Sequence, residues 1–165
     1  MLIVRQAQLI IVAGLPGSGK TTYLHQLKAA GYIDWHYDDF QDHSRNKSPN
    51  PKHSRYYGSL IKHLRYHQTV AVADIRYCTP LHIQELLTAL YNTVPHLSLA
   101  VEAHYFENNP QACLANVEMR ARALATRNFV YEAGLIKEYS AQYEIASNLI
   151  KLPILPVRRV WEHQS

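Results

Sequence analysis

The most informative stretch of the chain is Gly14-Leu15-Pro16-Gly17-Ser18-Gly19-Lys20-Thr21. It matches the pattern G-x-x-x-x-G-K-[ST] and directly follows an apolar run at residues 9–13 that is rich in β-branched side chains. A segment compatible with a helix continues from Thr22. A strand, a glycine-rich loop and a helix in this order are the setting in which the pattern holds the phosphates of a nucleotide. The stretch therefore predicts a phosphate-binding loop.

The chemistry expected of this loop follows from its residue types. Glycines permit a tight turn whose backbone N–H groups face one concavity, and the positive end of the following helix dipole attracts anions as well. Lys20 is expected to reach the β- and γ-phosphates of ATP, and the Thr21 hydroxyl is expected to ligate Mg²⁺. The residues expected to bind ATP are Gly14, Leu15, Pro16, Gly17, Ser18, Gly19, Lys20, Thr21 and Thr22.

The composition is that of a globular protein with one core. Of the 165 residues, 47% are hydrophobic and 18% are charged, so we expect a single domain over residues 1–165. The net charge of +4 suits an anionic partner, although solubility alone explains it equally well. Cys78 and Cys113 form no C-x-x-C motif and are expected to be buried thiols. Because no signal peptide or membrane-spanning run is found, we expect a cytoplasmic protein with no membrane partner.

Short apolar runs alternate with helical patterns along the chain. Strands are expected at 9–13, 33–37, 69–73 and 97–106, and helices at 55–67, 81–91 and 110–125. This alternation predicts an α/β fold, a three-layer sandwich around a mostly parallel sheet of about five strands. The remaining segments are expected to be a proline-broken mobile loop at about 42–53, a helix at 128–149 and a last short strand at 157–161.

Two strand ends direct carboxylates toward the predicted loop. Asp38 and Asp39 follow the strand at 33–37, and ligands of α/β sheets bind at the carboxyl ends of the strands. Asp38 is therefore expected to accept the proton of a hydroxyl that attacks the γ-phosphate, with Asp39 as the other candidate base. The alternative is a pair of aspartates that begins a helix, since Asp is a good N-cap residue.

Asp74 closes the strand at 69–73, and a hydrophobic strand that ends in a carboxylate is the Walker-B arrangement close to Mg²⁺. The alternative is a turn aspartate without a metal role. Arg76 follows two residues later. We expect it to contact the acceptor substrate together with Asp38 and Asp39.

A third group of candidates lies on the helix expected at 110–125. In a continuous helix, offsets of four and eleven residues bring Arg120 and Arg127 to within about 40° of Asn116. Fixed guanidinium groups stabilise the charge that phosphoryl transfer spreads over the phosphate oxygens. A solvated basic helix face is the alternative.

The motifs at 14–21, 37–40, 70–74, 113–127 and 132–144 resemble, in this order, those of small P-loop kinases. The chain is most similar to the 5′-hydroxyl polynucleotide kinase and zeta-toxin-like family, over roughly residues 9–150. The resemblance implies an adenylate-kinase-like sheet, Asp38 as general base, and a helical lid at about 116–132 that carries Arg120 or Arg127. In polynucleotide kinases a phosphate-contacting arginine follows the base by three positions. Gln41 occupies that position in this chain.

We therefore predict a kinase that uses ATP and Mg²⁺ and moves the γ-phosphate to a hydroxyl acceptor. The acceptor is either a nucleic-acid 5′-hydroxyl or a small hydroxylated metabolite, and the sequence leaves this choice open. The predicted catalytic residues are Lys20, Asp38, Arg120 and Arg127, and the predicted metal ligands are Thr21 and Asp74. One alternative is a regulatory protein that binds or hydrolyses ATP without an acceptor, and another is a nucleic-acid-binding protein with an accessory nucleotide site.

Overall fold

The structure is a computed structural model, and it describes residues 6–39, 55–124, 128–146, 149–151 and 153–158. Several predictions made from the sequence fall outside these ranges. They are the mobile loop at 42–53, Arg127, and the larger part of the strand expected at 157–161.

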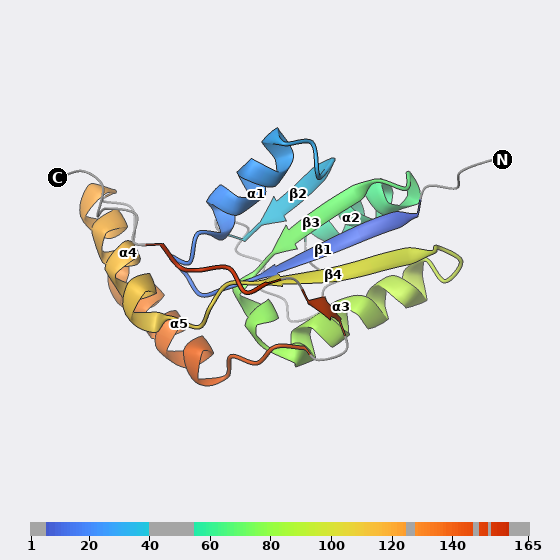
Figure 1. Cartoon of the computed structure of the whole chain (residues 1–165). Coiled ribbons are helices and arrows are strands. Elements are labelled where there is room, and N and C mark those ends of the chain that lie inside the picture. Colours follow the sequence, from blue (N-terminus) through green and yellow to red (C-terminus); the bar gives the residue numbers. More distant parts are fainter. Residues whose placement is uncertain (1–5, 40–54, 125–127, 147–148, 152, 159–165) are drawn as a thin grey trace.

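A parallel sheet forms the centre of the molecule (Figure 1). Its strands lie in the order β2 (Trp35–Asp38), β3 (Thr69–Ala73), β1 (Ala7–Ala13), β4 (Leu99–Tyr105) and β5 (Ile150–Lys151). The α/β class and the parallel sheet are confirmed, with four strands of four to seven residues and a fifth of only two. β1 suits the centre because its side chains, apart from Gln8, are apolar and buried on both faces, as a strand covered on both sides requires.

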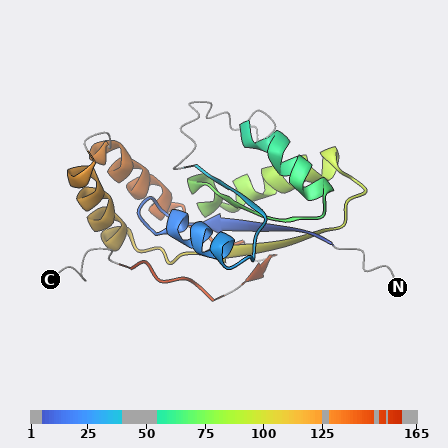
Figure 2. The ribbon, with the colours of Figure 1, turned by 90° about the horizontal axis from the view of Figure 1, so that it is seen from above.

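Helices pack against both faces of the sheet. They are α1 (Lys20–Ala29), α2 (Arg55–Arg65), α3 (Pro80–Thr93), α4 (Pro110–Ala123) and α5 (Phe129–Ala141), with a short 3₁₀ helix η2 (Ile75–Cys78) before α3. Alternate residues of β1 belong to two hydrophobic cores. Leu9 and Ile11 pack in a core with α2 and α3, and Ile10 and Val12 pack in a core with α1, α4 and α5. Figure 2 shows α2 and α3 together on one side of the sheet. These layers are compatible with a P-loop-like sandwich.

The predicted helix at 128–149 was too long. α5 ends at Ala141, and the chain that follows bonds to η2 and β4 instead of continuing the helix. The Glu144 N–H donates to the carbonyl of Cys78 (3.0 Å), and the Ala146 N–H donates to the Tyr105 hydroxyl (2.9 Å). Tertiary hydrogen bonds therefore decide where this helix stops.

The fifth strand of the described sheet lies at Ile150–Lys151, where the sequence predicted no strand. Leu155 forms a single parallel bridge with Phe106. Val157 and Arg158 belong to no strand, and residues 159–161 lie outside the described ranges. Pro153 and Pro156 lack the N–H group that a continuous ladder needs, which limits pairing in this segment.

Candidate functional site

The glycine loop joins β1 to α1 at the carboxyl edge of the sheet. Gly17 and Gly19 have φ angles of 78° and 107°, a region that side chains rarely adopt. A Cβ atom on Gly17 would lie 2.7 Å from the carbonyl oxygen of Cys113, and one on Gly14 would lie 2.4 Å from Ser18 Oγ. The loop therefore needs glycine both for its backbone angles and for its close contact with α4.

Lys20 lies folded into this loop. Its ammonium group donates hydrogen bonds to the carbonyl oxygens of Gly14 (2.8 Å) and Leu15 (3.2 Å), and the residue is only 7% exposed. Ser18 Oγ is buried and has no hydrogen-bond partner among the described residues. A buried cation beside an unsatisfied hydroxyl is an environment suited to an oxygen-rich anion.

Thr21 and Asp38 are in direct contact. The Thr21 hydroxyl donates to Asp38 Oδ2 at 2.6 Å, and Asp38 is buried. The parallel register pairs Asp38 with Ala73, so the residues that follow, Asp39 and Asp74, leave the sheet at the same edge. The structure thus brings the predicted base next to the predicted metal ligand of the loop.

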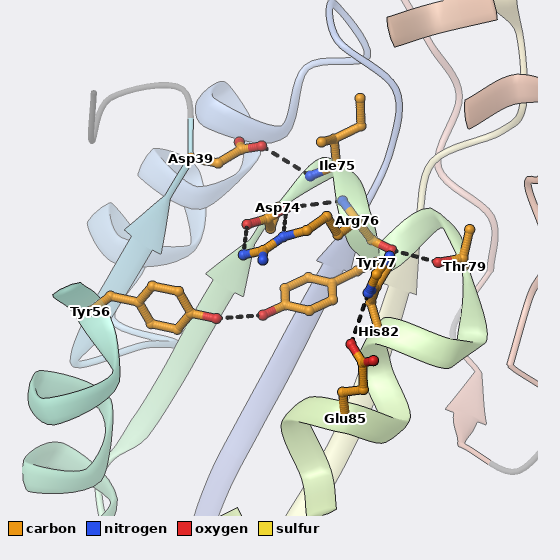
Figure 3. Close-up of polar contacts among 9 residues, drawn as sticks. All are labelled: Asp39, Tyr56, Asp74, Ile75, Arg76, Tyr77, Thr79, His82 and Glu85. Carbon is orange, nitrogen blue, oxygen red and sulfur yellow. Dashed lines mark hydrogen bonds and ion pairs between the residues drawn. The ribbon is translucent and has the colours of Figure 1, made fainter. Parts of the chain in front are cut away.

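Asp74 is held by Arg76, an arrangement that the sequence did not indicate (Figure 3). Asp74 Oδ1 accepts hydrogen bonds from the Arg76 backbone N–H (2.9 Å) and Nε (3.0 Å), and Oδ2 accepts from Nη2 (2.7 Å). These bonds raise the pKa of Arg76 above its ordinary value, although burial by itself would lower this pKa. Asp74 also caps η2, so the predicted alternative of a turn aspartate describes part of its role.

Asp39 lies close to the other carboxylates and to Lys20. Its Oδ2 accepts a hydrogen bond from the Ile75 N–H at 2.9 Å (Figure 3). Burial raises the pKa of Asp39 to about 7, and the charges of Asp74 and Asp38 act in the same direction, whereas Lys20 and the Ile75 N–H lower it. The three aspartates therefore form one electrostatic cluster at the loop.

α4 contributes the third part of the site. Asn116 Nδ2 donates to the carbonyl oxygen of Gly17 at 2.9 Å, which connects α4 directly to the loop. Arg120 lies one turn further along α4, and its Nη2 contacts Glu132 Oε1 of α5 at 2.5 Å. α4 ends at Ala123, so the continuous face expected for Arg127 does not form within α4. No sequence pattern indicates the contact between Glu132 and Arg120, because it depends on how two helices pack.

Oxygen atoms of the kind that ligate Mg²⁺ lie at this edge, in the Thr21 hydroxyl and the carboxylates of Asp38 and Asp74. In the part of the chain that the structure describes, no three His, Cys, Asp or Glu side chains form a group that could hold a metal ion by themselves. Mg²⁺ is usually bound through one or two carboxylates together with substrate phosphates, so this donor set fits it. Cys78 and Cys113 are buried free thiols, as predicted. Within the described ranges, no helix has the length and apolar character needed to cross a membrane.

Comparison with known proteins shows a shared fold. No protein-family model matches the chain. It is 28% identical over 140 residues to the uncharacterized protein R277 of Acanthamoeba polyphaga mimivirus, a match that covers 85% of this chain and 88% of that protein. Among solved structures, a chain of the Pnkp1/Rnl/Hen1 RNA repair complex matches with a TM-score of 0.51 at 11% identity, covering 85% of this chain.

The match spans 47% of that RNA repair chain, so the present chain corresponds to about half of it. The crystal structure of APE1195 matches with a TM-score of 0.50 at 15% identity, covering 92% of this chain and 86% of that one. At such identities the similarity shows the fold alone.

Proposed function

We propose that the protein is an ATP-dependent kinase that transfers the γ-phosphate to a hydroxyl group. The observation that carries this proposal is the contact between the glycine loop and a strand-end carboxylate. The Thr21 hydroxyl lies 2.6 Å from Asp38 Oδ2, while the adjacent Lys20 is buried in the same loop. The fold shared with a chain of an RNA repair complex that contains Pnkp1 supports a kinase-like P-loop architecture.

The loop residues would bind the triphosphate. Lys20 and the backbone N–H groups of the loop neutralise the β- and γ-phosphates. Thr21 and Asp74 would hold Mg²⁺, which when bound neutralises phosphate charge. Because both Asp74 oxygens already accept hydrogen bonds from Arg76, a contact through water suits Asp74 better than direct coordination.

The acceptor would bind between the aspartates and Arg76. We propose that Asp38 orients the acceptor hydroxyl and takes its proton, that Asp39 and Arg76 contact the acceptor, and that Arg120 and Arg127 of an adenylate-kinase-like lid at 116–132 close over the phosphoryl group. A nucleic-acid 5′-hydroxyl and a small hydroxylated metabolite remain the two acceptor classes.

A transfer assay tests the proposal. The protein is incubated with Mg²⁺, ATP labelled at the γ-phosphate, and panels of oligonucleotides, nucleosides, sugars and aminoglycosides. Label on one acceptor class is the expected result. Label found only on ATP or free phosphate with every acceptor would instead support a regulatory ATP-binding protein. Tight oligonucleotide binding with a steep salt dependence but no transfer would support the nucleic-acid-binding alternative.

The Asp38→Asn variant tests the proposed base. Loss of the proton acceptor should lower turnover by about 10² or more, while the dissociation constant for ATP stays within a few-fold of wild type. Asp34→Asn is the matched control, because Asp34 is exposed near the opposite end of β2 and accepts a hydrogen bond from the Thr69 N–H. Full transfer by Asp38→Asn would move the base to Asp39 or remove this assignment.

A further inference from the structure

α4 packs directly against the glycine loop. The position of a Cβ on Gly17 is 2.7 Å from the carbonyl oxygen of Cys113 and 3.0 Å from Val117 Cγ1, and Asn116 donates a hydrogen bond to the Gly17 carbonyl. Residues three and four apart share one side of a helix. Arg120 therefore begins the next turn on the side of α4 that contacts the loop.

Glu132 meets Arg120 from α5. Arg120 Nη2 and Glu132 Oε1 are 2.5 Å apart, and their side chains are only 23% and 11% exposed. Asn128 caps α5 by accepting a hydrogen bond from the Tyr131 N–H (3.1 Å), which fixes the helix turn that carries Glu132. A buried carboxylate that loses its partner is strongly unfavourable, so Glu132 keeps the Arg120 guanidinium in place.

A second arginine–glutamate pair on α4 provides a contrast. Arg122 Nη2 and Glu118 Oε1 are 2.6 Å apart, but their side chains are 69% and 47% exposed. Exposed ion pairs of this kind contribute little to stability, and they do not hold either side chain in one geometry. The two pairs have the same chemistry, and they differ in burial and in whether they join two helices.

We infer that Glu132 is a positioning residue, which directs the Arg120 guanidinium toward a phosphoryl group bound in the glycine loop. This inference rests on the proposed kinase function. A guanidinium is planar with its N–H donors in fixed directions, so a carboxylate that holds Nη2 restricts the directions of the other donors. Glu132 itself touches no substrate in this arrangement, and its effect on transfer passes entirely through Arg120.

A double-mutant cycle on transfer tests this dependence. The variants are Arg120→Met, Glu132→Gln and the double variant, with Glu118→Gln as the matched control. Measurements are kcat and KM for ATP with the acceptor found in the transfer assay, together with the dissociation constant for MgATP. We expect kcat to fall about 100-fold in Arg120→Met and about 10-fold in Glu132→Gln, with ATP affinity within about threefold of wild type. The double variant should be no slower than Arg120→Met, and Glu118→Gln should match wild type.

Three results of the transfer measurements on these variants would overturn the inference. They are wild-type turnover in Glu132→Gln, a double variant whose loss is the product of the two single losses, and an equal loss in Glu118→Gln. Thermal melts identify a variant that does not fold. In that case Glu132→Asp, which keeps the negative charge, should recover part of the turnover. A Glu132→Asp variant that folds but is inactive would also contradict the inference. If wild type transfers phosphate to no acceptor, the proposed function fails, and the rate of ATP hydrolysis is measured for the same variants. The positioning role is then overturned separately by three results. They are additive losses of the hydrolysis rate, no loss in any variant, and no hydrolysis by wild type.

Discussion

Gly17 shows how much one residue decides in this loop. It has a positive φ of 78°, and a Cβ would come within 2.7 Å of the Cys113 backbone. Gly17→Ala should therefore destabilise the protein by about 1–3 kcal/mol and abolish ATP binding, because loop and α4 must both shift. Urea denaturation and ATP titration measure the two effects. Gly134→Ala is the control, since that glycine is exposed in α5 with open space around it, and about 0.5–1 kcal/mol of stabilisation is expected there.

Asp39 should make stability depend on pH in an identifiable direction. Burial raises its pKa to about 7, whereas the unfolded chain should show the ordinary value of about 4. Between these two values the folded state binds the proton and the unfolded state does not, so Asp39 makes folding less favourable as pH rises from about 4 to about 7. The free energy of unfolding is measured for wild type and for Asp39→Asn by urea denaturation in the presence of EDTA. The wild-type value minus the variant value should fall as the pH rises through this window. Parallel pH curves for the two proteins would contradict the assignment.

Residue types in the loop could be predicted because each has a local reason. Glycines at 14, 17 and 19 and the lysine at 20 follow from what a phosphate loop requires. The bidentate contact of Arg76 with Asp74 could not be predicted, because it depends on side-chain torsions and on the turn into η2. The same holds for the hydrogen bond from Thr21 to Asp38, which joins residues 17 positions apart.

At the scale of elements, α4 depends on its N-cap. Asn109 Oδ1 accepts a hydrogen bond from the Ala112 N–H at 3.1 Å, and Pro110 follows at the first helical position. Asn109→Ala should lower the free energy of unfolding by about 1 kcal/mol, whereas Asn109→Asp should retain most of it. Asn92→Ala, at an exposed position in the last turn of α3, should change stability by less than about 0.5 kcal/mol. Equal effects at positions 92 and 109, measured by urea denaturation, would contradict the capping role.

Element boundaries could be predicted where local signals exist. Pro80 and Pro110 mark the starts of α3 and α4 as expected, and the apolar runs correspond to β1 and β3. The end of α5 carries no glycine or proline, and it was missed because its cause is non-local. Tyr143 donates to the carbonyl of Phe106, Glu144 bonds to Cys78 of η2, and Ala146 bonds to Tyr105 of β4. No pattern within residues 128–149 encodes those partners.

At the scale of the whole molecule, the sheet joins the two cores into one unit. Leu64 of α2 is fully buried in one core and Leu24 of α1 in the other, and β1 and β3 supply alternate residues to both. Losing one core would expose one face of the strands whose other face belongs to the remaining core. We therefore expect the described sheet and its helices to unfold cooperatively, without an intermediate that keeps only one core.

Truncating a leucine in each core tests this coupling. Leu64→Ala and Leu24→Ala should each cost about 2–5 kcal/mol, the range for large-to-small changes at buried sites. In each variant the whole urea transition should shift, and circular dichroism and tryptophan fluorescence, to which Trp35 beside the α2–α3 core contributes, should report the same midpoint because both cores share one sheet. Leu81→Ala, at a position 64% exposed, should stay within about 0.5 kcal/mol of wild type. Separate midpoints for the two probes in only one core variant would mean that the cores unfold independently, and the sheet would then not couple the loop side of the molecule to the α2–α3 side.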